Sequence, residues 1–190
     1  MLRVAFKEWA AICRALALGR QAIILRKGGI AETGGSFEPE HNRFWLYPTY
    51  VHQQQGGLKP DAAELVHAAE ADRPPASILR LSHFVEVKAI YRVEKLFGVL
   101  LLEDLHCWSE ETVRQRFAYR APGLYVLAVR VFALPRPHQL PEHATYAGCR
   151  TWVDLSRDLP TDDTRPVLSD GQFEDLLLSL SRRLNPTAMA

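Results

Sequence analysis

Glu86 and Lys88 form an E-x-K pair on a segment whose apolar and polar side chains alternate. Alternation places both side chains on one face of a strand, where a carboxylate can hold a metal ion and a lysine can stabilise developing charge. A metal-dependent nuclease of the restriction-endonuclease type needs a further acid, which Asp61, after Pro60, or Asp72 could supply. In the competing interpretation, which the pattern favours, Glu86 and Lys88 form the solvent face of an ordinary half-buried strand.

Basic residues interleaved with aromatic ones indicate a second chemistry, the binding of nucleic acid. Guanidinium groups contact phosphates, and aromatic faces stack on bases. The candidate contacts are Arg26, Lys27, Trp45, Tyr47, Trp108, Arg116, Tyr119, Arg120 and Arg130. Large aromatic side chains also fill cores, so Trp45 and Phe117 have a structural interpretation as well.

Arg130 interrupts an apolar run from Leu124 to Leu134. Such a run is typical of a strand covered on both faces, in the middle of a sheet. A guanidinium keeps its proton, so a buried one needs acceptors or an opening to a ligand such as phosphate. Arg130 therefore either contacts a ligand, pairs with a carboxylate of a neighbouring strand, or marks the point where the strand reaches solvent.

Metal and nucleophile chemistry have less support. The seven histidines form no H-x-H or H-E-x-x-H pair, and His106 beside Cys107 provides too few ligands for a tetrahedral site. Cys13, Cys107 and Cys149 are far apart and lack zinc-site spacing, which favours reduced thiols in a cytosol. We therefore expect no metal, no cofactor and no disulfide.

Length and composition indicate one globular domain. The chain has 190 residues, of which 47% are hydrophobic and 24% charged, enough to bury a single core. Its 23 basic and 22 acidic residues give no global attraction to nucleic acid, so binding would depend on local clusters. No uncharged apolar run approaches the roughly 20 residues of a bilayer span. We expect a cytoplasmic domain over residues 1–184 and a frayed tail over 185–190.

The elements that would position these residues alternate irregularly between strands and helices. Helices are predicted over 1–19, after an Asp61 cap, after a Ser109 cap, and after a Ser169 and Gln172 capping box. Strands are predicted over 20–27, 43–48, 77–93, 96–105, 124–134 and 145–155, with a hairpin around the glycines of 28–35 and a rigid proline linker over 135–141. Without regular βαβ alternation, we expect an α+β fold, a bent mixed sheet or small barrel of about six strands.

A series of motifs extends along almost the whole chain, from about Phe6 to Phe173. In order they are KEWA, LRKGGIAE, FWLYPTYVHQ, HCWSEETVRQRFAYR, LYVLAVRVFALPRP, YAGCRTWVDL and PVLSD. Together they resemble a bacterial family known as domain of unknown function 1802, a name that carries no activity. Members are sometimes found with an Mrr-type restriction endonuclease domain, so the resemblance implies a nuclease partner and a part in restriction-modification.

A looser similarity is to the PUA-like group, which includes the ASCH and EVE domains. The order of the strand over 85–91, the arginine-bearing helix and the strand over 124–134 is similar to theirs. Lys27 and Glu32 echo part of the ASCH pattern G-x-K-x-x-E-x-R, with other spacing and no following arginine. This similarity implies a small bent-sheet module with a pocket for RNA or a modified base.

These observations together favour a noncatalytic module that binds DNA or RNA or reads a modified base. Two alternatives stay open. One is the metal-dependent nuclease that would use Glu86 and Lys88 with Asp61 or Asp72. The other is a protein-interaction subunit of a defence complex.

Overall fold

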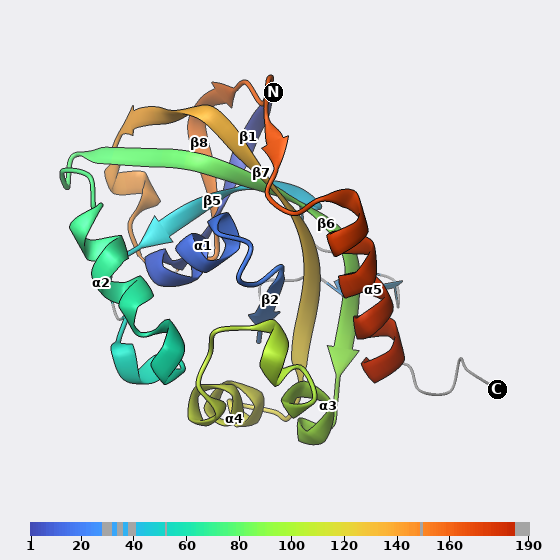
Figure 1. Cartoon of the computed structure of the whole chain (residues 1–190). Helices are drawn as coiled ribbons and strands as arrows, with labels where there is room; N and C mark the ends of the chain where they lie inside the picture. Colours follow the sequence, from blue (N-terminus) through green and yellow to red (C-terminus); the bar gives the residue numbers. More distant parts are fainter. Residues whose placement is uncertain (28–31, 34–35, 38–40, 52, 149, 185–190) are drawn as a thin grey trace.

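A bent, mixed β-sheet organises the chain, with helices packed around it (Figure 1). The computed structural model describes residues 1–27, 32–33, 36–37, 41–51, 53–148 and 150–184. The predicted glycine hairpin over 28–35 and the tail over 185–190 fall largely or wholly outside these residues. Within them, the α+β class expected from the sequence is confirmed.

Seven strands form the main sheet, in the order β2-β7-β6-β5-β1-β8, with β9 pairing β7. Their bounds are β1 (Leu2–Trp9), β2 (Ile23–Arg26), β5 (Arg43–Thr49), β6 (Ile78–Val93), β7 (Leu124–Pro141), β8 (Trp152–Leu159) and β9 (Arg165–Pro166). A separate pair consists of β3 (Glu32–Thr33) and β4 (Ser36–Phe37). Only β1 and β5 run parallel among the described pairs, so the sheet is mixed.

The longest pairing joins β6 to β7, from Ile78 opposite Pro141 to Val93 opposite Leu124. Two register shifts interrupt it, and such bulges bend a strand pair. At the first, residues 134–137 lie opposite Ser82 alone. The predicted proline linker is therefore wrong, because β7 continues to Pro141. Pro135 and Pro137 lie in this bulge, where they do not have to donate a hydrogen bond to the neighbouring strand.

Five α-helices accompany the sheet in the described chain: α1 (Ala10–Ala17), α2 (Glu64–Ala71), α3 (Leu96–Leu100), α4 (Glu110–Ala118) and α5 (Asp170–Leu184). Two predicted caps are confirmed. The Ser109 hydroxyl accepts from the Thr112 amide at 3.3 Å, and Ser169 and Gln172 exchange hydrogen bonds of 2.9 and 3.3 Å. None of the described helices has the length and apolar character needed to cross a bilayer.

Three local predictions are wrong. Residues 2–9 form β1 and not a helix, because β5 and β8 pair with both of its edges. Residues 96–105 form helical turns, in which Val99 and Leu102 face the core with i, i+3 spacing. Asp61 does not cap α2, which begins at Glu64; it lies in a short 3₁₀ turn, 3.9 Å from Arg20.

Two apolar clusters stabilise the fold. The larger contains residues of β2 and β7 together with the inner faces of α1, α2 and α4. The smaller gathers residues of β1, β5 and β8 with the end of the β6–β7 ladder. Strand alternation sends Phe44 and Leu46 into the larger cluster and Trp45 and Tyr47 into the smaller one, so β5 is buried on both faces.

Arg130 attaches α5 to the sheet. Its guanidinium donates to the Ser169 carbonyl at 3.0 Å and pairs with Asp170 at 2.5 Å, in the first turn of α5. The Phe173 ring lies 5.1 Å from the same guanidinium. The Arg130 side chain is buried, with the residue 7% exposed. Its hydrogen-bond acceptors come from the start of α5, whereas the sequence suggested a carboxylate of a neighbouring strand as one possible partner.

We expect Arg130→Met to lower the free energy of unfolding by about 1–3 kcal/mol, because a hydrogen bond and an ion pair of a charged group are lost. Chemical denaturation measures this change, and hydrogen exchange should show faster exchange in α5. Arg165→Met is the matched control, since Arg165 is exposed on β9. Equal destabilisation by the two substitutions would contradict the anchoring role.

His106 is 5% exposed, and its Nδ1 has no hydrogen-bond partner among the described residues. Burial, aided by the charge of Lys59, lowers the pKa of His106 from 6.5 to about 4. The unfolded chain therefore binds more protons between these two values, so stability falls as the pH falls from 6.5 towards 4 and levels off below.

Between about pH 7 and about pH 5, this histidine should remove roughly 2 kcal/mol from the free energy of unfolding. Urea denaturation across this range should show a shallower pH dependence for His106→Gln than for the wild type. His83, whose pKa burial also lowers, contributes to both proteins and cancels in the comparison. Identical slopes would show that His106 is not buried in its neutral form.

Candidate functional site

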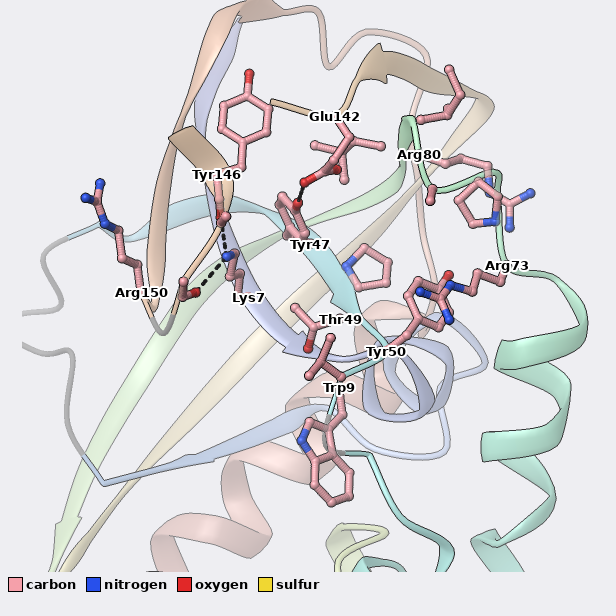
Figure 2. A pocket seen from close by; sticks show the side chains of 18 of the residues that line it. Lys7, Trp9, Tyr47, Thr49, Tyr50, Arg73, Arg80, Glu142, Tyr146 and Arg150 are labelled. Carbon is pink, nitrogen blue, oxygen red and sulfur yellow. Dashed lines mark hydrogen bonds between the residues drawn. The ribbon is translucent and has the colours of Figure 1, made fainter. Parts of the chain in front are cut away.

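A pocket of about 660 Å³ opens where β1 and β5 end (Figure 2). One wall is the connection between α2 and β6, with residues 73–76. The opposite wall comes from the connection between β7 and β8, with Glu142 and residues 146–148. Residues 47–51, at the end of β5 and just beyond it, also line the pocket. Segments far apart in the sequence thus meet around a single space.

The lining is strongly basic, in contrast to the chain as a whole. Five cationic side chains contribute to it: Lys7, Arg26, Arg73, Arg80 and Arg150. Glu142 is the one carboxylate among the described lining residues. Aromatic residues lie between these charges: Trp9, Tyr47, Tyr50 and Tyr146.

Lys7 holds the β7–β8 connection against β1. Its ammonium group donates to the carbonyl oxygens of Tyr146 and Gly148, the latter at 3.0 Å, as the dashed lines of Figure 2 show. The same nitrogen lies 5.4 Å from the centre of the Tyr47 ring. Lys7 therefore both shapes the wall of the pocket and places positive charge in it.

Tyr47 and Glu142 meet at the upper edge of the pocket in Figure 2. The Tyr47 hydroxyl donates to Oε1 of Glu142. Burial, followed by this hydrogen bond, raises the pKa of the Tyr47 phenol well above its usual range, so it stays a donor at physiological pH. Because a carboxylate has about four lone-pair sites, Glu142 keeps acceptor capacity toward the pocket.

Arginines and Tyr50 form the side of the pocket next to α2. The Arg73 guanidinium lies 4.6 Å from the centre of the Tyr50 ring. Arg80 pairs with Asp72 at 2.7 Å. Tyr50 and Arg80 also line a smaller cavity of about 150 Å³ that contains Cys13, so they separate the two spaces.

Arg26 and Trp9 close the pocket on the side nearest the large core cluster. Arg26 donates to the Thr151 hydroxyl at 2.8 Å and lies 3.8 Å from Glu8, a buried carboxylate. The Trp9 ring packs edge-on against Trp108 at 4.9 Å. A side chain at Gly57 would come within 2.7 Å of the Trp9 ring, so only glycine fits there without movement.

Of the nucleic-acid contacts predicted from the sequence, the structure brings Arg26 and Tyr47 into this pocket. Trp45 does not line it. That ring is fully buried in the smaller cluster, and its indole nitrogen donates to the Leu2 carbonyl at 3.0 Å. A base cannot stack on a ring that the core covers on both faces.

Apart from Arg130, which holds the start of α5, the other predicted contacts gather around α4 and not at the pocket. Trp108 is 1% exposed and lies under the Arg116 guanidinium, at 3.5 Å from the ring centre. Lys27 donates to three backbone carbonyls at the end of α4, including that of Phe117 at 2.9 Å. Tyr119 and Arg120 are exposed at the same end. This set therefore consists of a stack of Arg116 on the buried Trp108 ring and a small exposed surface at Tyr119 and Arg120.

The candidate nuclease residues lie apart from one another. Glu86 pairs with Lys88 at 2.7 Å and with Arg43 at 3.4 Å. Asp72 pairs with Arg80 near the start of β6. Glu86 lies six residues after Arg80 on the same strand, which corresponds to roughly 20 Å at the usual rise of a strand. Asp61 lies near Arg20. Within the described part of the chain, no three His, Cys, Asp or Glu side chains are placed to share a metal ion.

Several lining residues were not predicted from the sequence: Lys7, Trp9, Tyr50, Arg73, Arg80, Glu142, Tyr146 and Arg150. Lys7 and Trp9 were assigned to a helix, where they would not share a face, but they lie on the same face of β1. Two of the remaining ones lie beside prolines in connections between elements: Arg73 precedes Pro74, and Glu142 follows Pro141. Such positions are where binding residues concentrate, and this signal could have indicated them.

Three solved structures are similar to the chain. The crystal structure of ASCH from Zymomonas mobilis has 14% sequence identity and a TM-score of 0.49, covering 92% of this chain and 93% of that one. Crystal structures of two single-residue mutants of the same ASCH protein have 13% identity and TM-scores of 0.45 and 0.41. They cover 92% of this chain, and 96% and 94% of their own. A comparison with curated proteins gave no match.

A family profile covers most of the chain. The profile described as domain of unknown function (DUF1802) matches residues 5–178, which include all the described strands except the first three residues of β1, and the first nine of the fifteen residues of α5. This range agrees with the span of motifs from Phe6 to Phe173 noted in the sequence. The chain therefore belongs to the DUF1802 family.

Proposed function

We propose that this pocket binds a nucleotide of a DNA or RNA strand without cleaving it. The observation that carries the proposal is the meeting of five cationic side chains and four aromatic ones around one space of about 660 Å³. This volume is within the range of small-ligand sites, roughly 300–1,000 Å³. The chain as a whole has a formal net charge of only +1, so the basic character is concentrated at the pocket.

Each part of a nucleotide finds a suitable group there. Arginine guanidinium groups bind phosphate oxygens in pairs, and Arg73 is half-exposed at the rim of the pocket. The rings of Trp9 and Tyr50 can support a base by stacking, which tolerates any sequence. Pro74 and Pro75 add apolar surface on the same side as Tyr50. A strand could pass across the opening while one of its bases enters.

The contacts of the candidate nuclease residues favour a noncatalytic role. The Glu86 carboxylate is occupied by Lys88 and Arg43, and neither Glu86 nor Lys88 lines the pocket. The association with a nuclease partner in restriction-modification, implied by the sequence resemblance, stays a prediction. In that setting the module would supply binding and the partner would supply cleavage.

We expect Arg73→Gln to weaken binding of single-stranded oligonucleotides about tenfold or more at low salt, because a charge-assisted phosphate contact is worth about 1.5–3 kcal/mol. The slope of log affinity against log salt should also decrease by about one unit. Fluorescence anisotropy with labelled DNA and RNA strands measures both quantities. Mg²⁺ is included, and the strands are run on a gel afterwards.

Arg114→Gln is the matched control for this experiment. Arg73 and Arg114 are both 46% exposed, and each pairs with a glutamate three or four residues before it, but Arg114 lies on α4 away from the pocket. Equal effects of the two substitutions, or no binding by the wild type, would contradict the proposal. Cleaved strands that disappear with Glu86→Ala would replace it with the nuclease.

The exposed end of α4 is the competing surface, and Arg120 tests it. Arg120 has a φ of 62°, so Arg120→Gly removes the charge while accepting the backbone conformation. If the pocket is the binding site, this variant should keep the wild-type affinity and salt slope in the same anisotropy assay. A loss with Arg120→Gly but not with Arg73→Gln would place the site on α4.

A further inference from the structure

Glu142 is the one group among the described lining residues that carries negative charge, and its position is fixed. Its backbone amide donates to the Ser77 carbonyl at 2.8 Å, which ties the end of β7 to the start of β6. The Tyr47 hydroxyl holds Oε1. The structure shows no partner for Oε2 among the described residues. Oε2 and the remaining lone pair of Oε1 are thus available to a ligand.

The charges around Glu142 orient any nucleotide that enters. Figure 2 shows Arg73 and Arg80 on one side of the Tyr47–Glu142 pair and Lys7 and Arg150 on the other. A phosphate is attracted to these cations and repelled by the carboxylate. The base, which is neutral and partly apolar, is the part of the ligand that can approach Glu142. Pro75 and the Tyr47 ring provide apolar surface for it.

A carboxylate only accepts hydrogen bonds, so it discriminates among base edges. Guanine presents two adjacent donors on its Watson–Crick edge, N1–H and the N2 amine, which match the two oxygens of a carboxylate. Cytosine and adenine place one amine donor beside a ring acceptor, which the carboxylate repels. Uracil and thymine place one donor between two carbonyl acceptors. Guanine is therefore the base that this acceptor fits best.

We infer that Glu142 makes the pocket selective for an unpaired guanine, which it would contact through the Watson–Crick edge. The inference rests on the proposed function and adds the class of base to it. Tyr47 acts as a positioning residue, because it orients the carboxylate and leaves Oε2 and one lone pair of Oε1 to the base. The arginines contribute affinity that does not depend on the base, and Glu142 contributes the choice of base.

The test uses labelled oligothymidine and oligouridine strands that carry one central guanine, inosine, adenine, cytosine or 5-methylcytosine. The wild type should bind the guanine strand about 5- to 150-fold more tightly than the adenine or cytosine strands, the range expected for one bidentate base contact. Inosine lacks the N2 amine, so its strand should fall between the two groups.

Glu142→Gln keeps an oxygen for the Tyr47 hydroxyl and replaces the second oxygen with a donor. It should abolish the preference for guanine. Binding of the guanine-free strands should be kept or tightened, because a charge that repels phosphate is lost, and this retained binding shows that the variant is folded. Retained guanine preference in Glu142→Gln would overturn the inference.

Two further outcomes separate this inference from the proposed function. Equal binding of all strands, with Arg73→Gln still weakening each of them, would overturn the guanine selectivity alone. Preference for cytosine or 5-methylcytosine would overturn it as well, since those edges pair a donor with an acceptor. Binding of no strand by the wild type would overturn both proposals.

Discussion

The antiparallel ladder between β6 and β7 positions both the walls of the pocket and the helices at the opposite end of the sheet. Its two register shifts bend both strands. At one end, residues 73–76 lead into β6 just where Glu142 leaves β7, and the Glu142 amide joins them through Ser77. This places the two walls of the pocket opposite each other. At the other end, Val93 opposite Leu124 brings α3 and α4 to the large apolar cluster.

The arginines of the chain divide according to where the backbone places them relative to the core. Arg116 stacks on a buried indole, and Arg130 satisfies carbonyl and carboxylate groups at the start of α5. Both use their planar, permanently charged groups to fix internal geometry. Arg73, on a connection, keeps a half-exposed guanidinium at the pocket. The same residue type thus serves stability in one place and recognition in another.

Local patterns predicted the elements well where the pattern had one physical explanation. Alternation over 77–93 corresponds to β6, and the caps at Ser109 and Ser169 begin α4 and α5. The prediction failed for 2–9 and 96–105, where short apolar runs fit either a helix or a strand. In the first case the neighbouring strands decided the conformation. In the second, contacts of Val99 and Leu102 with the core decided it.

The α+β class, the helix caps at Ser109 and Ser169 and the family could be predicted from the sequence, because they depend on residue type, local spacing and the order of motifs. The sequence also identified Arg26 and Tyr47 as binding candidates from their chemistry. Only the tertiary structure decided which side chains share a pocket. Lys7, Arg73 and Glu142 meet because strands far apart in the sequence pair in one register. A shift of one residue would turn such side chains to the opposite face, and no local pattern encodes that register.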